Sequence, residues 1–260
     1  MELGLKDKVA LVTGSSRGIG RGVALALAAE GCDVMLTGRD AVALDEVANA
    51  IRKSGRRAGI AALDLREKGA VEKLIEQVRR ELGGLDILVN NAGATKRGDF
   101  LTLTDADFED GYALKFFAHV RLTRAAWPLL KERRGSLISI GGTGGRKPTA
   151  EFTIGASVNA AVAAFSKCMA DRGREEGVQV NCIHPSMVET DRLWRRIKAE
   201  MERTGWPEDK ARKEMCRGFG ITRFGTVEDV ADLITFLVSA RATWMHGATI
   251  DLDGGEIPTL

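Results

Sequence analysis

The sequence has little proline, little tyrosine and almost no net charge, and each shortage excludes a class of protein. Only 5 prolines and 1 tyrosine occur in 260 residues, and no proline-rich linker interrupts the chain. The 38 basic and 36 acidic residues leave a net charge of +2. Because a polyanion is attracted by a large positive excess, nucleic acid is not expected as a partner. With 44% hydrophobic residues and 30 glycines, the chain is expected to be globular rather than disordered.

The cysteines and the lack of long apolar runs bear on the compartment. Cys32, Cys168, Cys182 and Cys216 form no Cys-x-x-Cys pair and no metal-ligand spacing with histidine, so we expect buried free thiols and no metal. The apolar run 23–29 is too short to span a bilayer. The start of the chain lacks the apolar stretch of a signal peptide. We therefore expect a soluble cytoplasmic protein with no membrane partner.

Short apolar runs alternate with stretches of helical period along the whole chain. The expected strands lie at 9–12, 34–36, 60–63, 87–89, 137–140, 178–183 and 248–252. The expected helices lie between them, at 23–29, 42–51, 71–82, 105–131, 156–174, 187–215 and 227–239. Continuous apolar strands with intervening helices require a sheet covered on both faces. The sequence thus predicts an α/β fold, a single-domain, doubly wound, Rossmann-type structure over 1–260 with a seven-stranded, mainly parallel sheet and helices on both faces.

A glycine-rich loop follows the first expected strand. It runs straight into a helix and reads Thr13-Gly14-Ser15-Ser16-Arg17-Gly18-Ile19-Gly20. Small residues let backbone N–H groups at the helix N-terminus approach a pyrophosphate, although they also suit a plain tight turn. The fourth strand ends in Asn90-Asn91-Ala92-Gly93, and an open doubly wound sheet places that end beside the first strand, at the topological switch point. The two loops are expected to converge on one crevice.

The chain resembles the short-chain dehydrogenase/reductase family over essentially its full length. The resemblance is carried by these two loops, by Asp64 after the third strand, by 185–190 after the sixth and by Asp253-Gly254-Gly255 after the seventh. It implies that Asp64 contacts the adenine, that Asn91 supports the loop beside the cofactor and that Thr190 meets the nicotinamide carboxamide. The cofactor-binding residues that it implies are Gly14, Ser16, Arg17, Gly18, Ile19, Gly20, Arg39, Asp64, Leu65, Asn91, Ala92, Gly93, Pro185 and Thr190.

The end of the second strand indicates which nicotinamide cofactor binds. An NAD site places a carboxylate there for the ribose 2′-hydroxyl, whereas this sequence has Thr37-Gly38-Arg39. Arg39 and Arg17 offer two guanidinium groups that suit a 2′-phosphate, although both could instead be solvated surface arginines. NADP(H) is therefore the expected cofactor.

The residues that carry the family's chemistry are missing from this sequence. The family uses an asparagine, a serine and a Tyr-x-x-x-Lys pair, in which the tyrosine moves a proton at the substrate oxygen. Aligning residues 155–157 with the small residues inside that pair puts Ile154 at the tyrosine and Val158 at the lysine. Lys115 stands at the asparagine, and the serine position falls on Gly141 or Gly142. Because isoleucine and valine cannot transfer a proton, no appreciable reduction of simple ketones, aldehydes or β-ketoesters is expected.

Other side chains could supply the proton, and Lys115, His184 and Thr143 are the candidates. Lys115 shares one helical face with Tyr112 and His119, His184 ends the sixth strand, and Thr143 follows the serine position. Tyr112 and His119 could equally pack in the core, and His184 could be satisfied by backbone groups. Two hypotheses follow. The protein is an NADP(H)-binding oxidoreductase with a non-standard active site and an unknown substrate, or it is a catalytically silent cofactor-binding or scaffold protein.

Residues 187–216 correspond to the family's variable substrate lid. Leu193, Trp194, Ile197 and Met201 form an apolar stripe there, which either packs in a core or favours an apolar or aromatic small-molecule substrate. In the family, the helices expected at 105–131 and 156–174 form a paired-helix interface between subunits. The second of these is rich in alanine, which permits close packing, although its alanines could equally face the sheet. We therefore expect a homotetramer.

Overall fold

All seven strands form one parallel sheet. The computed structural model describes residues 2–258, so residues 1 and 259–260 of the expected domain lie outside it. The strands are β1 (Val9–Thr13), β2 (Asp33–Gly38), β3 (Ala58–Ala62), β4 (Ile87–Asn90), β5 (Ser136–Ile140), β6 (Gln179–Pro185) and β7 (Thr249–Leu252). Their order is β3-β2-β1-β4-β5-β6-β7, and every neighbouring pair is parallel. The expected Rossmann-type fold is confirmed, with strand ends within two residues of the expected ones.

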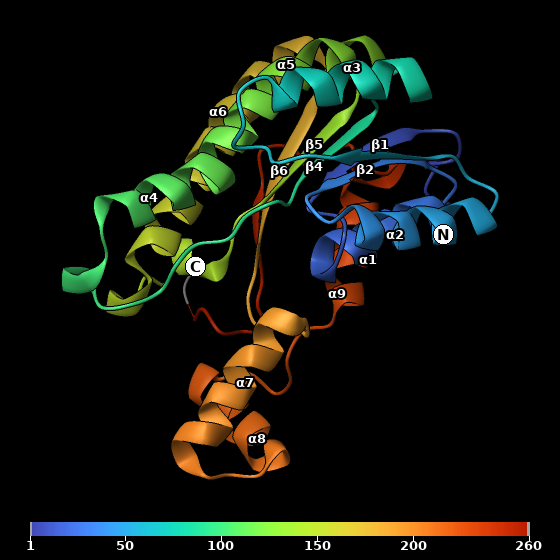
Figure 1. Cartoon of the computed structure of the whole chain (residues 1–260). Helices are drawn as coiled ribbons and strands as arrows, with labels where there is room; N and C mark the ends of the chain where they lie inside the picture. Colours follow the sequence, from blue (N-terminus) through green and yellow to red (C-terminus); the bar gives the residue numbers. More distant parts are fainter. Residues whose placement is uncertain (1, 259–260) are drawn as a thin grey trace.

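Helices cover both faces of the sheet (Figure 1). Their bounds are α1 (Gly18–Ala29), α2 (Ala41–Lys53), α3 (Ala70–Leu82), α4 (Asp105–Tyr112), α5 (Ala118–Arg133), α6 (Thr153–Glu176), α7 (Asp191–Thr204), α8 (Glu208–Phe219) and α9 (Val227–Leu237). Helices α1, α2 and α9 pack on one face, and α3, α5 and α6 on the other. Because the strand order reverses between β1 and β4, the helices that follow these two strands, α1 and α5, lie on opposite faces of the sheet and leave a crevice at the carboxyl ends of the strands.

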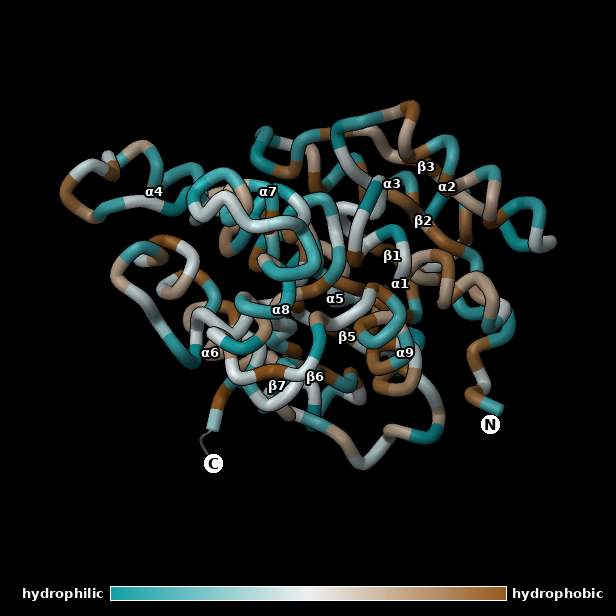
Figure 2. Tube along the Cα trace, turned by 90° about the horizontal axis from the view of Figure 1, so that it is seen from below, coloured by the Kyte–Doolittle hydropathy of each residue, from teal (hydrophilic) through white to brown (hydrophobic). Residues whose placement is uncertain are grey.

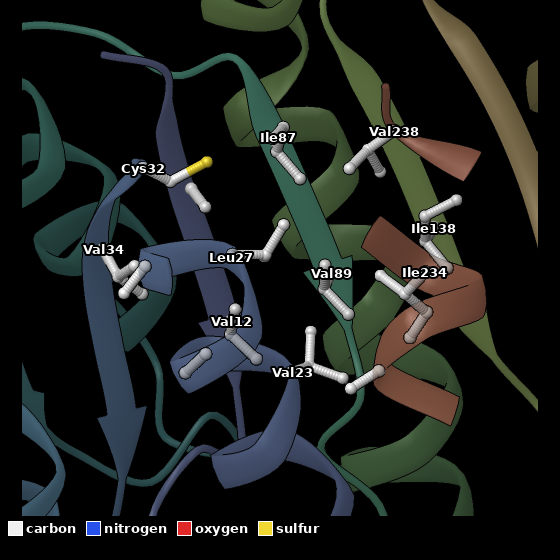
Figure 3. Packing of buried hydrophobic residues seen from close by; sticks show 14 of the residues in the cluster. Val12, Val23, Leu27, Cys32, Val34, Ile87, Val89, Ile138, Ile234 and Val238 are labelled. Carbon is white, nitrogen blue, oxygen red and sulfur yellow. The ribbon is translucent and has the colours of Figure 1, made fainter. Parts of the chain in front are cut away.

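The apolar core fixes the helix that follows the glycine loop. Figure 3 shows Val12 of β1, Leu27 of α1 and Ile234 of α9 within one cluster of buried side chains. All three are completely buried. Burial of a side chain of this size contributes about 1.5–3 kcal/mol to stability. The start of α1 is therefore held rigidly at the carboxyl end of β1, which is where a cofactor phosphate would lie.

Two helices, α7 and α8, stand away from the sheet beyond the carboxyl end of β6. They project below the sheet in Figure 1 and lie in front of it when the molecule is seen from below in Figure 2. The single helical stretch expected over 187–215 is wrong, because the chain turns at Gly205, whose φ is 70°, and restarts after Pro207. The expected lid therefore consists of two packed helices.

A π-helical turn interrupts the helix expected over 105–131. The turn η2 (Ala113–Phe117) joins α4 to α5 and contains Lys115. A π-turn inserts one extra residue into the helical ladder and rotates the faces on its two sides relative to one another. Lys115 and His119 both lie against the loop after β4, whereas Tyr112 packs in an apolar cluster.

Helix α6 is long and apolar enough to cross a membrane by length and composition alone, and it is the only such helix within residues 2–258. Sequence reasoning overlooked it because small and polar residues divide its apolar ones. Its buried face, which includes Val162 and Ala170, packs against the sheet, so this helix is accounted for by the fold.

All four cysteines are free thiols, but only two are buried. Cys32 and Cys182 lie in the core as expected. Cys168 is exposed on α6 and Cys216 is half-buried on α8, so the expectation of burial is wrong for these two.

Candidate active site

The glycine loop has the backbone geometry of an anion site. Gly14 and Gly18 adopt positive φ angles of 65° and 55°, which side chains disfavour. An ideal Cβ on Gly20 would lie 2.3 Å from the carbonyl oxygen of Gly14, so only glycine allows this close packing. Arg17 occupies the N-cap of α1 without a side-chain capping bond, and the first turn carries no acidic residue. The unsatisfied N–H groups and the helix dipole there favour a phosphate group.

Thr13 ties the glycine loop to the loop after β4. Its hydroxyl oxygen accepts hydrogen bonds from the backbone N–H groups of Asn91 and Ala92, at 2.8 and 2.9 Å. The side-chain amide of Asn91 donates in return to the carbonyl oxygen of Thr13 at 2.7 Å. The two loops expected to converge are therefore joined directly, and Asn91 has the loop-supporting position that the resemblance implied.

The end of β2 provides cationic side chains without a carboxylate partner. Gly38 lies beside Ser16 of the glycine loop, which places Arg39 next to that loop. Within residues 2–258 neither Arg17 nor Arg39 forms an ion pair, so both guanidinium groups are free to meet a phosphate. Together with the left-handed glycines and the uncapped start of α1, these residues fit a phosphorylated dinucleotide.

The carboxylate of Asp64, expected at the adenine, is held by another residue. Arg66 donates to both of its oxygens, at distances between 2.6 and 3.1 Å, and also contacts Asp110 of α4. This pairing lowers the pKa of Asp64. Leu65 is buried beside it, and its carbonyl oxygen accepts from Arg121. An adenine contact through Asp64 must therefore compete with the Arg66 ion pair.

The chain after β6 crosses the crevice. Thr190, which precedes α7, lies against Gly18, since an ideal Cβ on that glycine would be 3.3 Å from its Cγ2. Arg192 in the first turn of α7 donates to the carbonyl oxygen of Gly93 at 3.0 Å. Pro185 ends β6 at the foot of this crossing. The start of the lid therefore touches both cofactor loops.

Lys115 lies inside the crevice. Its Nζ donates to the carbonyl oxygen of Gly141, at the end of β5, at 2.9 Å. The stem of the side chain fills the space beside Gly93, where a Cβ would come within 2.8 Å of it. Burial, with a smaller contribution from Arg192, lowers the pKa of Lys115 to about 7. A lysine with this pKa can both donate and accept a proton near neutral pH.

Tyr112 and His119, the other two residues of the expected helical face, are packed against neighbouring residues. Tyr112 packs edge-to-face on Phe116, at 6.2 Å between ring centres, within an apolar cluster. His119 is buried with its Nε2 3.1 Å from the carbonyl oxygen of Ala92, and burial lowers its pKa to about 3. A neutral His119 therefore supports the loop after β4, and Lys115 alone of the three reaches the crevice.

His184 is buried within β6 and supports the turn after β5. Its Nδ1 accepts a hydrogen bond from the backbone N–H of Gly142 at 2.8 Å. An ideal Cβ on Gly141 would lie 2.5 Å from this ring, so the glycine makes room for the histidine. Burial lowers the pKa of His184 to about 4, which keeps the ring neutral. Thr143 closes the same turn through its carbonyl oxygen, which accepts from Arg146 and Lys147.

The structure corrects the expected placement of Ile154 and Val158. Both are completely buried in the apolar cluster around α6 and cannot face the crevice. The residue after Val158 does reach the turn after β5, since Asn159 lies beneath Gly142, where a Cβ would come within 2.9 Å of its Nδ2. Gly155, the residue after Ile154, faces the Phe152 ring.

Phe152 occupies the space in front of Gly155. An ideal Cβ on Gly155 would lie 2.0 Å from Cζ of the Phe152 ring, and one on Gly144 would lie 2.6 Å from the same ring. The guanidinium carbon of Arg97 lies 4.2 Å from the centre of the same ring. An aromatic ring and a cation thus line the wall in front of Gly155.

Most residues of the lid's apolar stripe pack against other residues of the lid. Leu193 and Ile197 are buried against Ala211, and Met201 joins the same cluster. Trp194 is 43% exposed and borders a cavity of about 310 Å³ between α7 and α8, away from Lys115. The alternative of a small internal core is therefore the better description of this stripe.

Comparisons with known proteins agree with this geometry. The family model for short chain dehydrogenases matches residues 8–201. The chain is 34% identical over 253 residues to an uncharacterized oxidoreductase of Mycobacterium tuberculosis, covering 96% of this chain and 92% of that protein. These similarities, the sheet order and the paired loops place the chain in the short-chain dehydrogenase family.

Two solved structures are similar over nearly the whole chain. L-sorbose reductase from Gluconobacter frateurii, in complex with NADPH and L-sorbose, has a TM-score of 0.96 and 32% identity, with all of both chains covered. A short chain dehydrogenase from Burkholderia cenocepacia, in complex with NADP, has a TM-score of 0.86 and 32% identity, with 97% of this chain and 98% of that chain covered.

Proposed function

We propose that this protein is an NADP(H)-dependent oxidoreductase in which Lys115 replaces the family's tyrosine as the proton donor. The observation that carries the proposal is the Lys115 amine, which lies 2.9 Å from the Gly141 carbonyl oxygen inside the crevice and has a pKa of about 7. His184 is the nearest alternative, but its Nδ1 already accepts from Gly142, so we assign it a positioning role.

The preference for NADP(H) is supported by charge. Arg39 and Arg17 flank the position of the adenosine ribose, and no carboxylate ends β2. Two solved relatives contain NADPH or NADP. The other expected contacts, including Thr190 beside the nicotinamide, belong to this proposal, as does a homotetramer built on α5 and α6.

Lys115 performs the acid–base step. Bound in this crevice, NADPH supplies the hydride for a substrate carbonyl carbon. Lys115 as an ammonium group donates its proton to the carbonyl oxygen and becomes a neutral amine, which burial favours. In the oxidative direction the neutral amine accepts the hydroxyl proton. Reduction should therefore slow as pH rises above about 7, and oxidation should quicken over the same range.

Replacing Lys115 tests the assignment. Lys115→Met should lower the rate of NADPH-dependent reduction by about 10²–10⁴, while NADPH affinity measured by calorimetry changes little. Lys167→Met is the matched control, since Lys167 also donates to a backbone carbonyl, that of Gly247, but is exposed on α6. Equal rates in Lys115→Met and wild type would exclude Lys115 as the donor.

A cofactor-binding protein without turnover is the second candidate. It is favoured by the Phe152 ring, which fills the wall where substrate meets a tyrosine in the family. Tight NADPH binding, with no oxidation of the bound cofactor by any carbonyl in a broad panel, would support this candidate over the first.

A further inference from the structure

The mouth of the crevice carries guanidinium groups from two separate elements. Arg97 follows β4 and stacks on the Phe152 ring, 4.2 Å from its centre. That ring packs against Gly144 in the turn after β5, and Lys115 donates to Gly141 in the same turn.

Arg196 reaches the same region from the lid. Its Nη1 lies 2.7 Å from Sδ of Met187, a residue of the chain that leaves β6, and its guanidinium carbon lies 5.5 Å from the centre of the Phe219 ring. Burial and the charge of Arg97 both lower the pKa of Arg196, so the two cations are close enough to repel one another.

Neither arginine has an ion-pair partner in the part of the chain that the structure describes, residues 2–258. The nearby carboxylates are those of Glu151, Glu256, Glu200 and Glu214, and the last two line the same cavity as Arg196 but pair with Arg203 and Arg217. Glu256 is already engaged by the Ser186 hydroxyl and by Lys147, whose Nζ is 3.8 Å away. By contrast, Arg203 on the outer side of α7 pairs with Glu200.

Arg97 and Arg196 have no ion-pair partner among residues 2–258 and are stacked on aromatic rings, so they are positioned to bind an anion. Stacking fixes the plane of each guanidinium group and leaves N–H groups available to a carboxylate or phosphate, although Nη1 of Arg196 already contacts Met187. Lys115 adds a third cation on the inner side of the mouth when it is protonated. A neutral substrate would leave these charges uncompensated as the lid covers them.

We propose that Arg97 and Arg196 bind an anionic group of the substrate, so that the protein acts on small oxo acids or hydroxy acids whose carbonyl or hydroxyl group reaches Lys115. This inference rests on the proposed function for its reaction, but the anion site itself does not depend on turnover. It differs from the expectation of an apolar or aromatic substrate, which rested on the apolar stripe of the lid.

Anion binding is measured first, without any reaction. Malonate and inorganic phosphate are titrated into the NADPH complex, and the fluorescence of the bound cofactor is followed. We expect saturable binding of at least one anion, weakened about tenfold or more in Arg97→Met and in Arg196→Met. Arg174→Met is the control, since Arg174 pairs with Asp171 on α6, and this variant should bind like wild type. Preference for malonate identifies a carboxylate group, and preference for phosphate identifies a phosphate ester.

Turnover is measured second, on matched pairs of an oxo acid and its methyl ester. We expect kcat/KM to favour the acid about a hundredfold in wild type and to lose most of that preference in either arginine variant. Anion binding without turnover would support the proposed anion site and overturn the proposed function. Turnover of esters as good as that of acids, with no anion binding, would overturn the site and retain the function. Absence of both would overturn both proposals.

Discussion

Replacing Lys115 by methionine should change how the stability of the protein depends on pH. Burial and Arg192 lower the pKa of Lys115 from 10.5 to about 7. Between these values the unfolded chain binds a proton that the folded protein does not, so the free energy of unfolding rises with pH. Below about pH 7 both states are protonated, and the folded state bears the full cost of a buried charge.

The size of the effect follows from the change in pKa. At about 1.36 kcal/mol per pKa unit the full change corresponds to about 5 kcal/mol, and because solvent reaches the half-buried side chain we expect about 2 kcal/mol. Lys115→Met should therefore be more stable than wild type by about 2 kcal/mol near pH 6, which raises the unfolding temperature by about 4–8 °C. The difference should shrink as pH rises through 7 toward 10.5.

Urea unfolding of both proteins, followed by tryptophan fluorescence over a series of pH values, measures the difference. Lys167→Met serves again as the control, since its exposed ammonium group should give no pH-dependent difference from wild type. A stability difference between Lys115→Met and wild type that stays constant across the series would refute the argument that Lys115 is buried as a neutral amine.

Arg39→Ala should weaken NADPH binding about tenfold to a hundredfold and leave NADH binding nearly unchanged in calorimetric titrations; equal losses for both cofactors would contradict the 2′-phosphate contact. Gly155→Ala should destabilise wild type by about 1 kcal/mol because its methyl group meets the Phe152 ring, yet stabilise the Phe152→Ala variant, since alanine is the better helix former. The same thermal shift in both backgrounds would show that the ring does not occupy that space. Light scattering should give a tetramer for wild type and smaller species for Ala164→Glu, which alters an exposed alanine of α6; a monomeric wild type would exclude the interface.

The sheet could be predicted from sequence because its signal is local. Each strand is a short run of buried apolar residues such as Val9 to Val12, bounded by glycine or polar residues, and parallel pairing follows from the helices between strands. The cofactor loops could be predicted for a related reason. A glycine needed for positive φ or for close approach, as at Gly14 and Gly20, has few substitutes, so it marks the loop in the sequence itself.

The wall of the site opposite the glycine loop was harder to predict, because one residue along a helix changes the direction of a side chain by about 100°. Ile154, Val158 and Val162 recur every four residues and form a buried stripe. That spacing was the available signal that the polar Asn159, rather than Val158, faces the crevice. The π-turn at Lys115 has no comparable signal, since no proline or glycine marks its position within 113–117.

The two helices that line the crevice carry the amine and the amide in the reverse of the arrangement that the family resemblance implies. In the family an asparagine stands on the helix after β4 and a lysine on the next long helix, whereas here Lys115 stands on the first and Asn159 on the second. The Lys115 amine lies against the turn after β5. On the α6 side, the Phe152 ring fills the space in front of Gly155. A substrate must therefore direct its oxygen toward η2 instead of α6. Under the two proposals above, Arg97, whose guanidinium carbon lies 4.2 Å from the centre of the Phe152 ring, would hold the far end of such a substrate, so the proposed proton donor and the proposed anion site belong to one arrangement.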